Sequence, residues 1–203
     1  MAESLKIEVY RNKSIDELSK CIADPENRAE AGSAAAASAA IAAALLARVS
    51  SFAFSRAEHA DEKLNWYVRN SEILRNYMVQ LVDEDIRCRG PLRRALKEGD
   101  DRSIEASRQA AVSICLEIIN MSGKMLEMAE GMLPYVQVES SAWLEECVDL
   151  AFGASLAAGR FVLHMVSLSP DDTYRYVMKR ENEITMQEQK SIYKRVLVSI
   201  RKP

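Results

Sequence analysis

A run of alanine constrains this chain more than any other feature. Ten of the fourteen residues from Ala31 to Ala44 are alanine, which has the highest helix propensity and, after glycine, the smallest side chain. After Gly32, neither glycine nor proline occurs again until Gly90. This pattern predicts long helices, and the first of them is thin enough for neighbouring helices or a second subunit to approach closely.

The remaining composition indicates an all-α protein. Seven glycines and five prolines in 203 residues are too few for the many turns of a β-sandwich or barrel. We expect a single domain over residues 1–203, folded as an antiparallel bundle of four to five long helices. The expected helices cover about 15–23, 33–51, 57–88, 91–98, 102–131, 140–168 and 170–200.

Local signals set the boundaries of these helices. Ser14 followed by Glu17 is a capping box at the start of the first helix. Gly90 and Pro91 are expected to end the helix over 57–88, because proline removes a backbone donor and clashes with the preceding turn. The last helix, about 170–200, is polar nearly all round over much of its length. We therefore expect it to be exposed or packed on a partner chain.

The charged, cysteine and histidine residues disfavour several classes of function. A formal net charge of −3 disfavours nucleic-acid binding through a strongly basic surface. Four widely spaced cysteines without a Cys-x-x-Cys pair, and two histidines, predict reduced thiols and no metal site. No signal-peptide pattern is present, and the alanine-rich stretch is short for a membrane span. We expect a cytoplasmic protein that binds neither nucleic acid nor a membrane.

Two acidic residues, Asp83 and Asp85, are candidates for chemistry. On a helix they point about 200° apart, so they do not form a paired-carboxylate dyad. Each has an arginine four residues later, Arg87 for Asp83 and Arg89 for Asp85. Taken alone, this spacing favours two surface ion pairs, which stabilise a protein little.

Gly32 and Ser33 stand at the start of the alanine helix. Free N–H groups at a helix N-terminus favour an anion or a ligand carbonyl, so a binding role is one interpretation. A routine cap by Ser33 is the simpler interpretation, and the residues alone favour it.

Several stretches of the chain resemble one known family. Residues 32–36, Gly-Ser-Ala-Ala-Ala, are similar to the glycine-rich opening of the alanine helix in the formiminotransferase-cyclodeaminase and methenyltetrahydrofolate cyclohydrolase family. Residues 81–85, Leu-Val-Asp-Glu-Asp, resemble its leucine-x-aspartate-x-aspartate stretch. Residues 104–117 and 139–153 are similar to its third and fourth long helices, so the resemblance covers about 14–168.

The resemblance implies a helical-bundle homodimer that acts on folate one-carbon units. Members hydrolyse 5,10-methenyltetrahydrofolate or release ammonia from 5-formiminotetrahydrofolate, and no tightly bound cofactor or metal is expected. Asp85, with Asp83 beside it, is then the candidate catalytic acid. The implied substrate-binding residues are Gly32, Ser33, Arg56, Glu139, Arg160 and His164.

Three of these binding residues also have plain structural interpretations. In the functional interpretation, Arg56 and Arg160 bind the carboxylates of the folate with their forked guanidinium groups. In the structural one, each arginine caps a helix end or extends its side chain along the helix surface. His164 lies on an apolar helix, where a buried core histidine is the simpler expectation and proton transfer the alternative.

The sequence also departs from the family pattern near the expected site. Residues 28–31, Arg-Ala-Glu-Ala, replace the Pro-Gly-Gly lead-in, and Arg89 takes the place of an aromatic residue. Two asparagines of the family fall on Ala157 and Phe161, or with a small shift on Arg160 and His164. A helical dimer that binds a folate or a partner without catalysis is therefore the alternative function.

Overall fold

The computed structural model describes residues 9–27, 29–57 and 62–201. Within these ranges all regular secondary structure is helical, as the composition predicts. The α-helices are α1 (Ile15–Ala23), α2 (Ala31–Ser55), α3 (Glu62–Glu98), α4 (Asp101–Met132), α5 (Val138–Ser167) and α6 (Asp172–Ile200), and a 3₁₀ turn, η1 (Leu133–Tyr135), joins α4 to α5.

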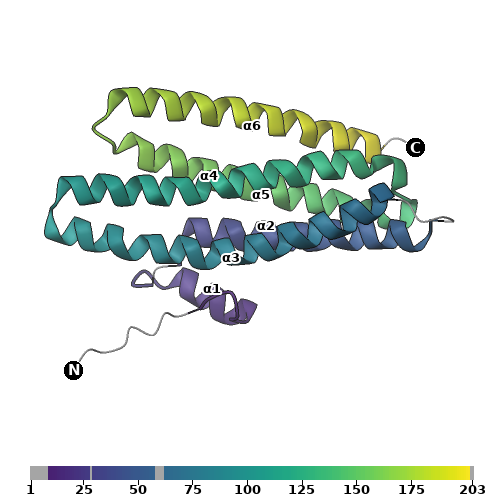
Figure 1. Cartoon of the computed structure of the whole chain (residues 1–203), viewed down its shortest axis with the longest axis horizontal. Helices are drawn as coiled ribbons and strands as arrows, with labels where there is room; N and C mark the ends of the chain where they lie inside the picture. The colour runs from purple at the N-terminus through teal and green to yellow at the C-terminus, as the bar shows by residue number, and fades with distance from the viewer. Residues whose placement is uncertain (1–8, 28, 58–61, 202–203) are drawn as a thin grey trace.

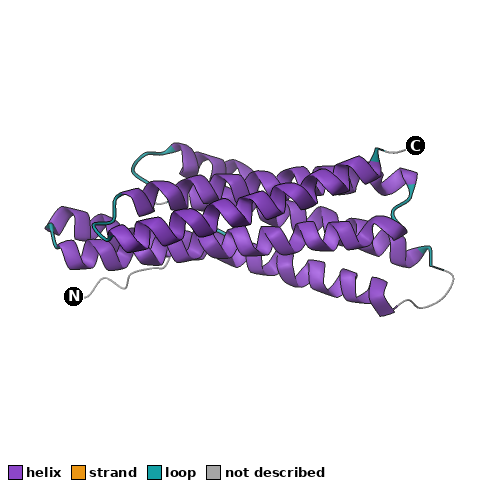
Figure 2. Ribbon diagram, turned by 90° about the horizontal axis from the view of Figure 1, so that it is seen from above, coloured by secondary structure: helices purple, strands orange, loops and turns teal. Residues whose placement is uncertain are grey.

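The long helices α2, α3, α4 and α5 pack side by side with alternating direction. α2 lies between α3 and α5, and α4 contacts the same two helices from the other side. α6 packs outside this group on α5 and α4, while α1 lies on the opposite surface beside α2 (Figure 1). Figure 2 shows the same elongated arrangement from above, with short loops at the two ends.

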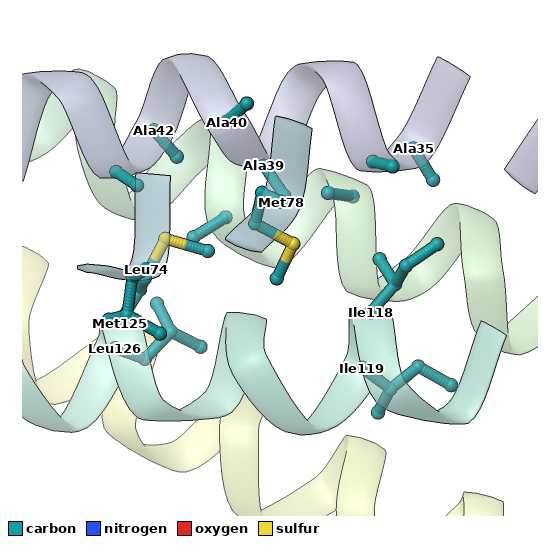
Figure 3. Packing of buried hydrophobic residues seen from close by; sticks show 14 of the residues in the cluster. Ala35, Ala39, Ala40, Ala42, Leu74, Met78, Ile118, Ile119, Met125 and Leu126 are labelled. Atoms are coloured by element: carbon teal, nitrogen blue, oxygen red, sulfur yellow. The ribbon is translucent and has the colours of Figure 1, made fainter. Parts of the chain in front are cut away.

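Alanine side chains of α2 leave room for larger residues at the centre of the bundle. Ala39, Ala42 and Ala43 are fully buried. Since interdigitating small and large side chains fill a core without voids, the thin helix and its neighbours fit together. The large buried side chains of α3 and α4 shown around α2 in Figure 3 include Leu74, Met78, Ile118, Met125 and Leu126.

Most predicted helices are confirmed, but the predicted break at Gly90–Pro91 is wrong. The capping box at Ser14 is present, whereas α3 continues through Pro91 to Glu98. Pro91 is exposed, so the carbonyl that loses its helical partner can face water. Beyond it, Leu92 and Ala95 are buried, and their packing keeps the chain helical.

The polar last helix is not fully exposed, because one of its faces packs on the bundle. One face of α6 buries two amides, Asn182 and Gln189, against the bundle. Gln189 Nε2 donates to the carbonyl of Ile119 at 2.9 Å, and Gln189 Oε1 accepts from Ser155 Oγ at 2.6 Å. Because buried amides need such partners, these bonds fix the register of α6 on α4 and α5.

Candidate functional site

The start of α2 meets the second half of α3 at the carboxylate of Asp85. Ser33 Oγ donates to Asp85 Oδ2 at 2.7 Å, and Arg89 Nη2 donates to Asp85 Oδ1 at 2.8 Å. Asp85 is 0% exposed. The two motifs that resemble the folate family, 52 residues apart in sequence, therefore meet at one buried carboxylate.

Gly32 is required by the close approach of Asp85. A Cβ on Gly32 would lie 2.2 Å from Asp85 Oδ1 and 2.5 Å from Asp85 Cγ, far inside van der Waals contact. The routine cap expected at Ser33 is wrong, because the N-cap residue of α2 is Glu30. Ser33 instead donates its hydroxyl hydrogen bond to Asp85. Gly32 leaves space for the Asp85 carboxylate, and Ser33 binds it.

Arg89 is the second residue that encloses Asp85. Arg89 is 1% exposed, and its guanidinium lies over the ring of Phe161, with 4.0 Å between Cζ and the ring centroid. Glu30 Oε2 is 3.5 Å from Arg89 Nη1. Burial by itself lowers the pKa of Arg89, but the charges of Asp85 and Glu30 outweigh it and the pKa is raised. The site therefore holds a charged guanidinium at neutral pH.

Asp83 has a different set of partners from Asp85. Asp83 Oδ1 accepts from the backbone N–H groups of Tyr10 at 2.7 Å and Arg11 at 3.1 Å, and Arg11 Nε lies 3.4 Å from Asp83 Oδ2. The expected pair with Arg87 is wrong, since Arg87 pairs with Glu84. Both aspartates are buried, so the expectation of two surface ion pairs is also wrong. Asp83 anchors the N-terminal segment to α3.

Two cysteines lie close to the Asp85 cluster as protonated thiols. Cys88 Sγ donates to the backbone carbonyl of Asp85 at 2.9 Å. Burial, and then the charge of Asp85, raises the pKa of Cys88 to about 11 and that of Cys115 to about 12. A thiol with such a pKa is a poor nucleophile at neutral pH. Across the described ranges, no group of three or more His, Cys, Asp or Glu residues is placed to hold a metal ion.

Arg56 and Glu139 do not join this cluster within one chain. Arg56 follows the last residue of α2, and Glu139 is in the first turn of α5. Their nearest charged atoms are 3.9 Å apart. Gly32 and Arg56 are 24 positions apart along the helix, which corresponds to about 36 Å. The predicted binding residues thus form two groups at opposite ends of α2.

Arg160 and His164 lie on the outer side of α5, and both are exposed. The expectation of a buried histidine at His164 is wrong, because Val162 and Val166 are the residues of this turn that are buried in the bundle while His164 is exposed. The residue of this helix that reaches the Asp85 cluster is Phe161, through its ring contact with Arg89. Of the two registers considered for the family's asparagines, the one that includes Phe161 faces the site.

Sequence reasoning missed the part that Arg89, Glu30 and Phe161 play in enclosing Asp85. The spacing of Asp85 and Arg89 by four residues indicated an ion pair, but the same spacing occurs at the surface and in a core. Phe161 could have been found, because it stands where the family has an asparagine. An aromatic residue at such a position indicates that the residue it contacts has changed as well, and that residue is Arg89.

Comparison with known proteins supports the resemblance. The sequence model of the formiminotransferase-cyclodeaminase family matches residues 14–182. A crystal structure of formiminotetrahydrofolate cyclodeaminase from Thermotoga maritima has a TM-score of 0.85 to this chain, with 19% sequence identity, and the match covers 93% of this chain and 96% of that one. At this identity the structural likeness shows a shared fold. No curated protein matches the chain. Since the family match spans most of its length, the chain belongs to the formiminotransferase-cyclodeaminase family.

Proposed function

We propose that this protein acts on a reduced folate one-carbon unit at Asp85, by hydrolysis of 5,10-methenyltetrahydrofolate or by cyclising deamination of 5-formiminotetrahydrofolate. The observation that supports the proposal is the meeting of Gly32, Ser33 and Asp85 at one point. These residues come from the two stretches that most resemble the family, and their contact keeps a carboxylate at the start of α2.

The chemistry of both reactions centres on a carbon that carries positive charge. In the hydrolysis, water adds to the carbon between two nitrogens and loses a proton to a base, and the bond to one nitrogen breaks as that nitrogen takes up a proton. In the deamination, the second folate nitrogen, an amine outside the pterin ring, adds to the carbon and gives up its proton, and the formimino nitrogen takes up a proton and leaves as ammonia. A carboxylate beside the carbon stabilises its charge and orients the attacking group, which is the role proposed for Asp85.

The enclosure of Asp85 favours a second candidate function, binding without turnover. Both carboxylate oxygens already have partners, Ser33 and Arg89, and the carboxylate has no exposed surface. A cationic substrate carbon must displace the Arg89 guanidinium before Asp85 can act on it. If Arg89 stays in place, the chain keeps the family fold as a binding module for a folate or a protein partner.

A binding titration followed by a turnover assay separates the two candidates. The chain is titrated with 5-formyltetrahydrofolate, a stable folate, and the loss of absorbance of the methenyl form is then followed with the same preparation. Binding with turnover supports the enzyme, and binding without turnover supports the second candidate. No binding of the folate and no turnover would contradict a folate function altogether.

A further inference from the structure

Arg89 has more hydrogen-bond donors than the surrounding chain pairs with acceptors. Its Nη2 donates to Asp85 Oδ1 at 2.8 Å. Its Nε and Nη1 are buried and find no hydrogen-bond partner among the described residues. A guanidinium has five N–H donors and no acceptor, and buried donors are nearly always paired. The unpaired donors of Arg89 therefore indicate an acceptor that comes from outside the chain.

Glu30 lies close to Arg89 Nη1, but a different arginine holds its carboxylate. Glu30 Oε2 is 3.5 Å from Arg89 Nη1, whereas Glu30 Oε1 accepts from Arg93 Nη2 at 3.1 Å. Arg93 is itself fixed to the segment before α2, since its Nη1 donates to the carbonyl of Glu26 at 3.0 Å. The side chain of Glu30 is 37% exposed, so Nη1 lies beside the part of the cluster that reaches the surface. An acceptor that enters beside Glu30 therefore meets an unpaired donor of Arg89.

The two candidate reactions place different chemical groups beside Arg89. Hydrolysis brings in water and leaves a formyl oxygen, which accepts hydrogen bonds. Deamination starts from a protonated formimino group, which presents only N–H donors, and ends with the cationic methenyl carbon. Facing donors repel each other, and so do two positive charges in a site that excludes water. A guanidinium at this position therefore favours the reaction that ends in a neutral group with an oxygen acceptor.

We infer that Arg89 is the specificity-determining residue of this site and that it selects an oxygen-bearing one-carbon unit, so that the chain hydrolyses the methenyl form and does not deaminate the formimino form. This inference rests on the proposed function. When the carbon takes the place of the guanidinium beside Asp85, Arg89 Nη2 loses its acceptor, and the oxygen on that carbon replaces it.

The hydrolysis supplies this oxygen from water. The oxygen bonds to the carbon and gives one proton to a base. The bond from the carbon to one nitrogen then breaks, that nitrogen takes up the remaining hydroxyl proton, and the oxygen becomes the formyl carbonyl. One proton is released overall and the positive charge of the carbon is lost, which a neighbouring guanidinium favours.

Phe161 holds the guanidinium of Arg89 by a contact that uses none of its donors. The ring centroid is 4.0 Å from Arg89 Cζ, and a cation over an aromatic face is attracted to it without a hydrogen bond. The N–H groups at the edge of the guanidinium stay available to other partners. Arg89 can therefore release Asp85 to a substrate and still remain in the site.

Binding of two stable folates tests the inference without any turnover. 5-Formyltetrahydrofolate carries the oxygen and 5-methyltetrahydrofolate lacks it, and calorimetric titration measures both dissociation constants. Because the oxygen accepts from a charged donor, wild type is expected to bind the formyl form about 10–100-fold more tightly. Arg89→Lys keeps a positive charge beside Asp85 but loses the planar fork, and its preference is expected to fall below about threefold. Arg87→Lys makes the same change at an exposed position of α3, and this control is expected to keep the wild-type preference.

The carbonyl stretch of the bound formyl group gives a second readout that needs no variant. 5-Formyltetrahydrofolate is labelled isotopically at the formyl carbon, and the infrared difference between labelled and unlabelled complexes isolates this stretch. A charge-assisted hydrogen bond from Arg89 weakens the carbonyl bond. The stretch is therefore expected at a lower frequency in the complex than in water.

Three results would overturn the inference while leaving the proposed function in place. Equal affinity of wild type for the two folates, or a carbonyl stretch at its frequency in water, would show that the site does not recognise the oxygen. An unchanged formyl preference in a folded Arg89→Lys variant would show that Arg89 is not the donor. Enzyme-dependent release of ammonia from 5-formiminotetrahydrofolate would show that Arg89 does not exclude the formimino unit. Absence of binding to both folates would instead contradict the proposed function, and the inference with it.

Discussion

Asp85 and Arg89 form an ion pair that water does not reach, with 2.8 Å between Oδ1 and Nη2 and side-chain exposures of 0% and 2%. Breaking such a pair leaves one buried charge uncompensated. We expect Arg89→Leu to lower the free energy of unfolding by about 3–5 kcal/mol. We expect Asp85→Asn combined with Arg89→Leu to lower it by less than the sum of the single losses.

Urea unfolding of the two single variants and the double variant measures this coupling. The exposed pair of Glu84 and Arg87 is the control, and its coupling is expected below about 1 kcal/mol. Equal coupling in the two pairs would show that Asp85 and Arg89 gain nothing from burial.

Gly32 is expected to tolerate no side chain. In Gly32→Ala the added Cβ meets the Asp85 carboxylate, which cannot turn aside freely because Ser33 and Arg89 hold it. We expect a loss of about 1–3 kcal/mol of stability, the usual cost of overpacking a core. Thermal unfolding measures the loss. Ala31→Ser is the control, because it adds an atom in the same turn at an exposed position. A similar loss of stability in that variant would show that contact with Asp85 is not the cause of the loss in Gly32→Ala.

Asp83 is expected to hold the N-terminal segment rather than to take part in chemistry. Asp83→Ala removes the acceptor for the N–H groups of Tyr10 and Arg11. The segment should then detach, so that trypsin cleaves after Arg11 and Lys13 faster than in wild type while α2–α6 stay resistant. Limited proteolysis followed by mass spectrometry reads this out, and unchanged cleavage rates would show that other contacts hold the segment.

The buried thiols predict a loss of stability at alkaline pH. Burial raises the pKa of Cys147 to about 12, from an ordinary value of 9.0. The folded state therefore favours the thiol, and this contribution is present in full below pH 9 and is lost as the pH rises toward 12. Above pH 9 the cost is about 1.4 kcal/mol per pH unit for one such group.

Chemical unfolding of wild type and Cys147→Ala at pH 8, 9, 10 and 11 isolates the contribution of this thiol. The variant has a lower stability at every pH because of the cavity, but its decline above pH 9 should be shallower than that of wild type. Parallel declines in the two proteins would mean that Cys147 does not contribute to the pH dependence.

The sequence predicted those features of the fold that depend on local chemistry. Ser14 and Glu17 form their capping box because the motif acts within one turn. Pro91 misled the prediction because tertiary packing of Leu92 and Ala95 outweighs the single backbone bond that proline removes. Local signals thus determine where a helix ends when the end is at the surface. Contacts with the core override such a signal where residues on both sides of it are buried, as they are around Pro91.

The sequence predicted residues of the candidate site, such as Gly32, Ser33 and Asp85, but it did not predict that Asp85 is buried. An aspartate and an arginine four residues apart have the same spacing at the surface and in a core, so the enclosure of Asp85 depended on which face of α3 meets α2. The anchoring of Tyr10 to Asp83 joins residues 73 positions apart, and no periodicity indicates such a contact.

The measurement that tests the central claim most directly compares methenyltetrahydrofolate hydrolysis by wild type, Asp85→Asn and Asp83→Asn, with melting temperatures recorded for all three. Asp85→Asn keeps the size of the side chain and removes its charge, and it should lower the rate by about 10²–10⁴-fold. Asp83→Asn should retain the wild-type rate. An unchanged rate in a folded Asp85→Asn variant would contradict the assignment of Asp85 as the catalytic carboxylate.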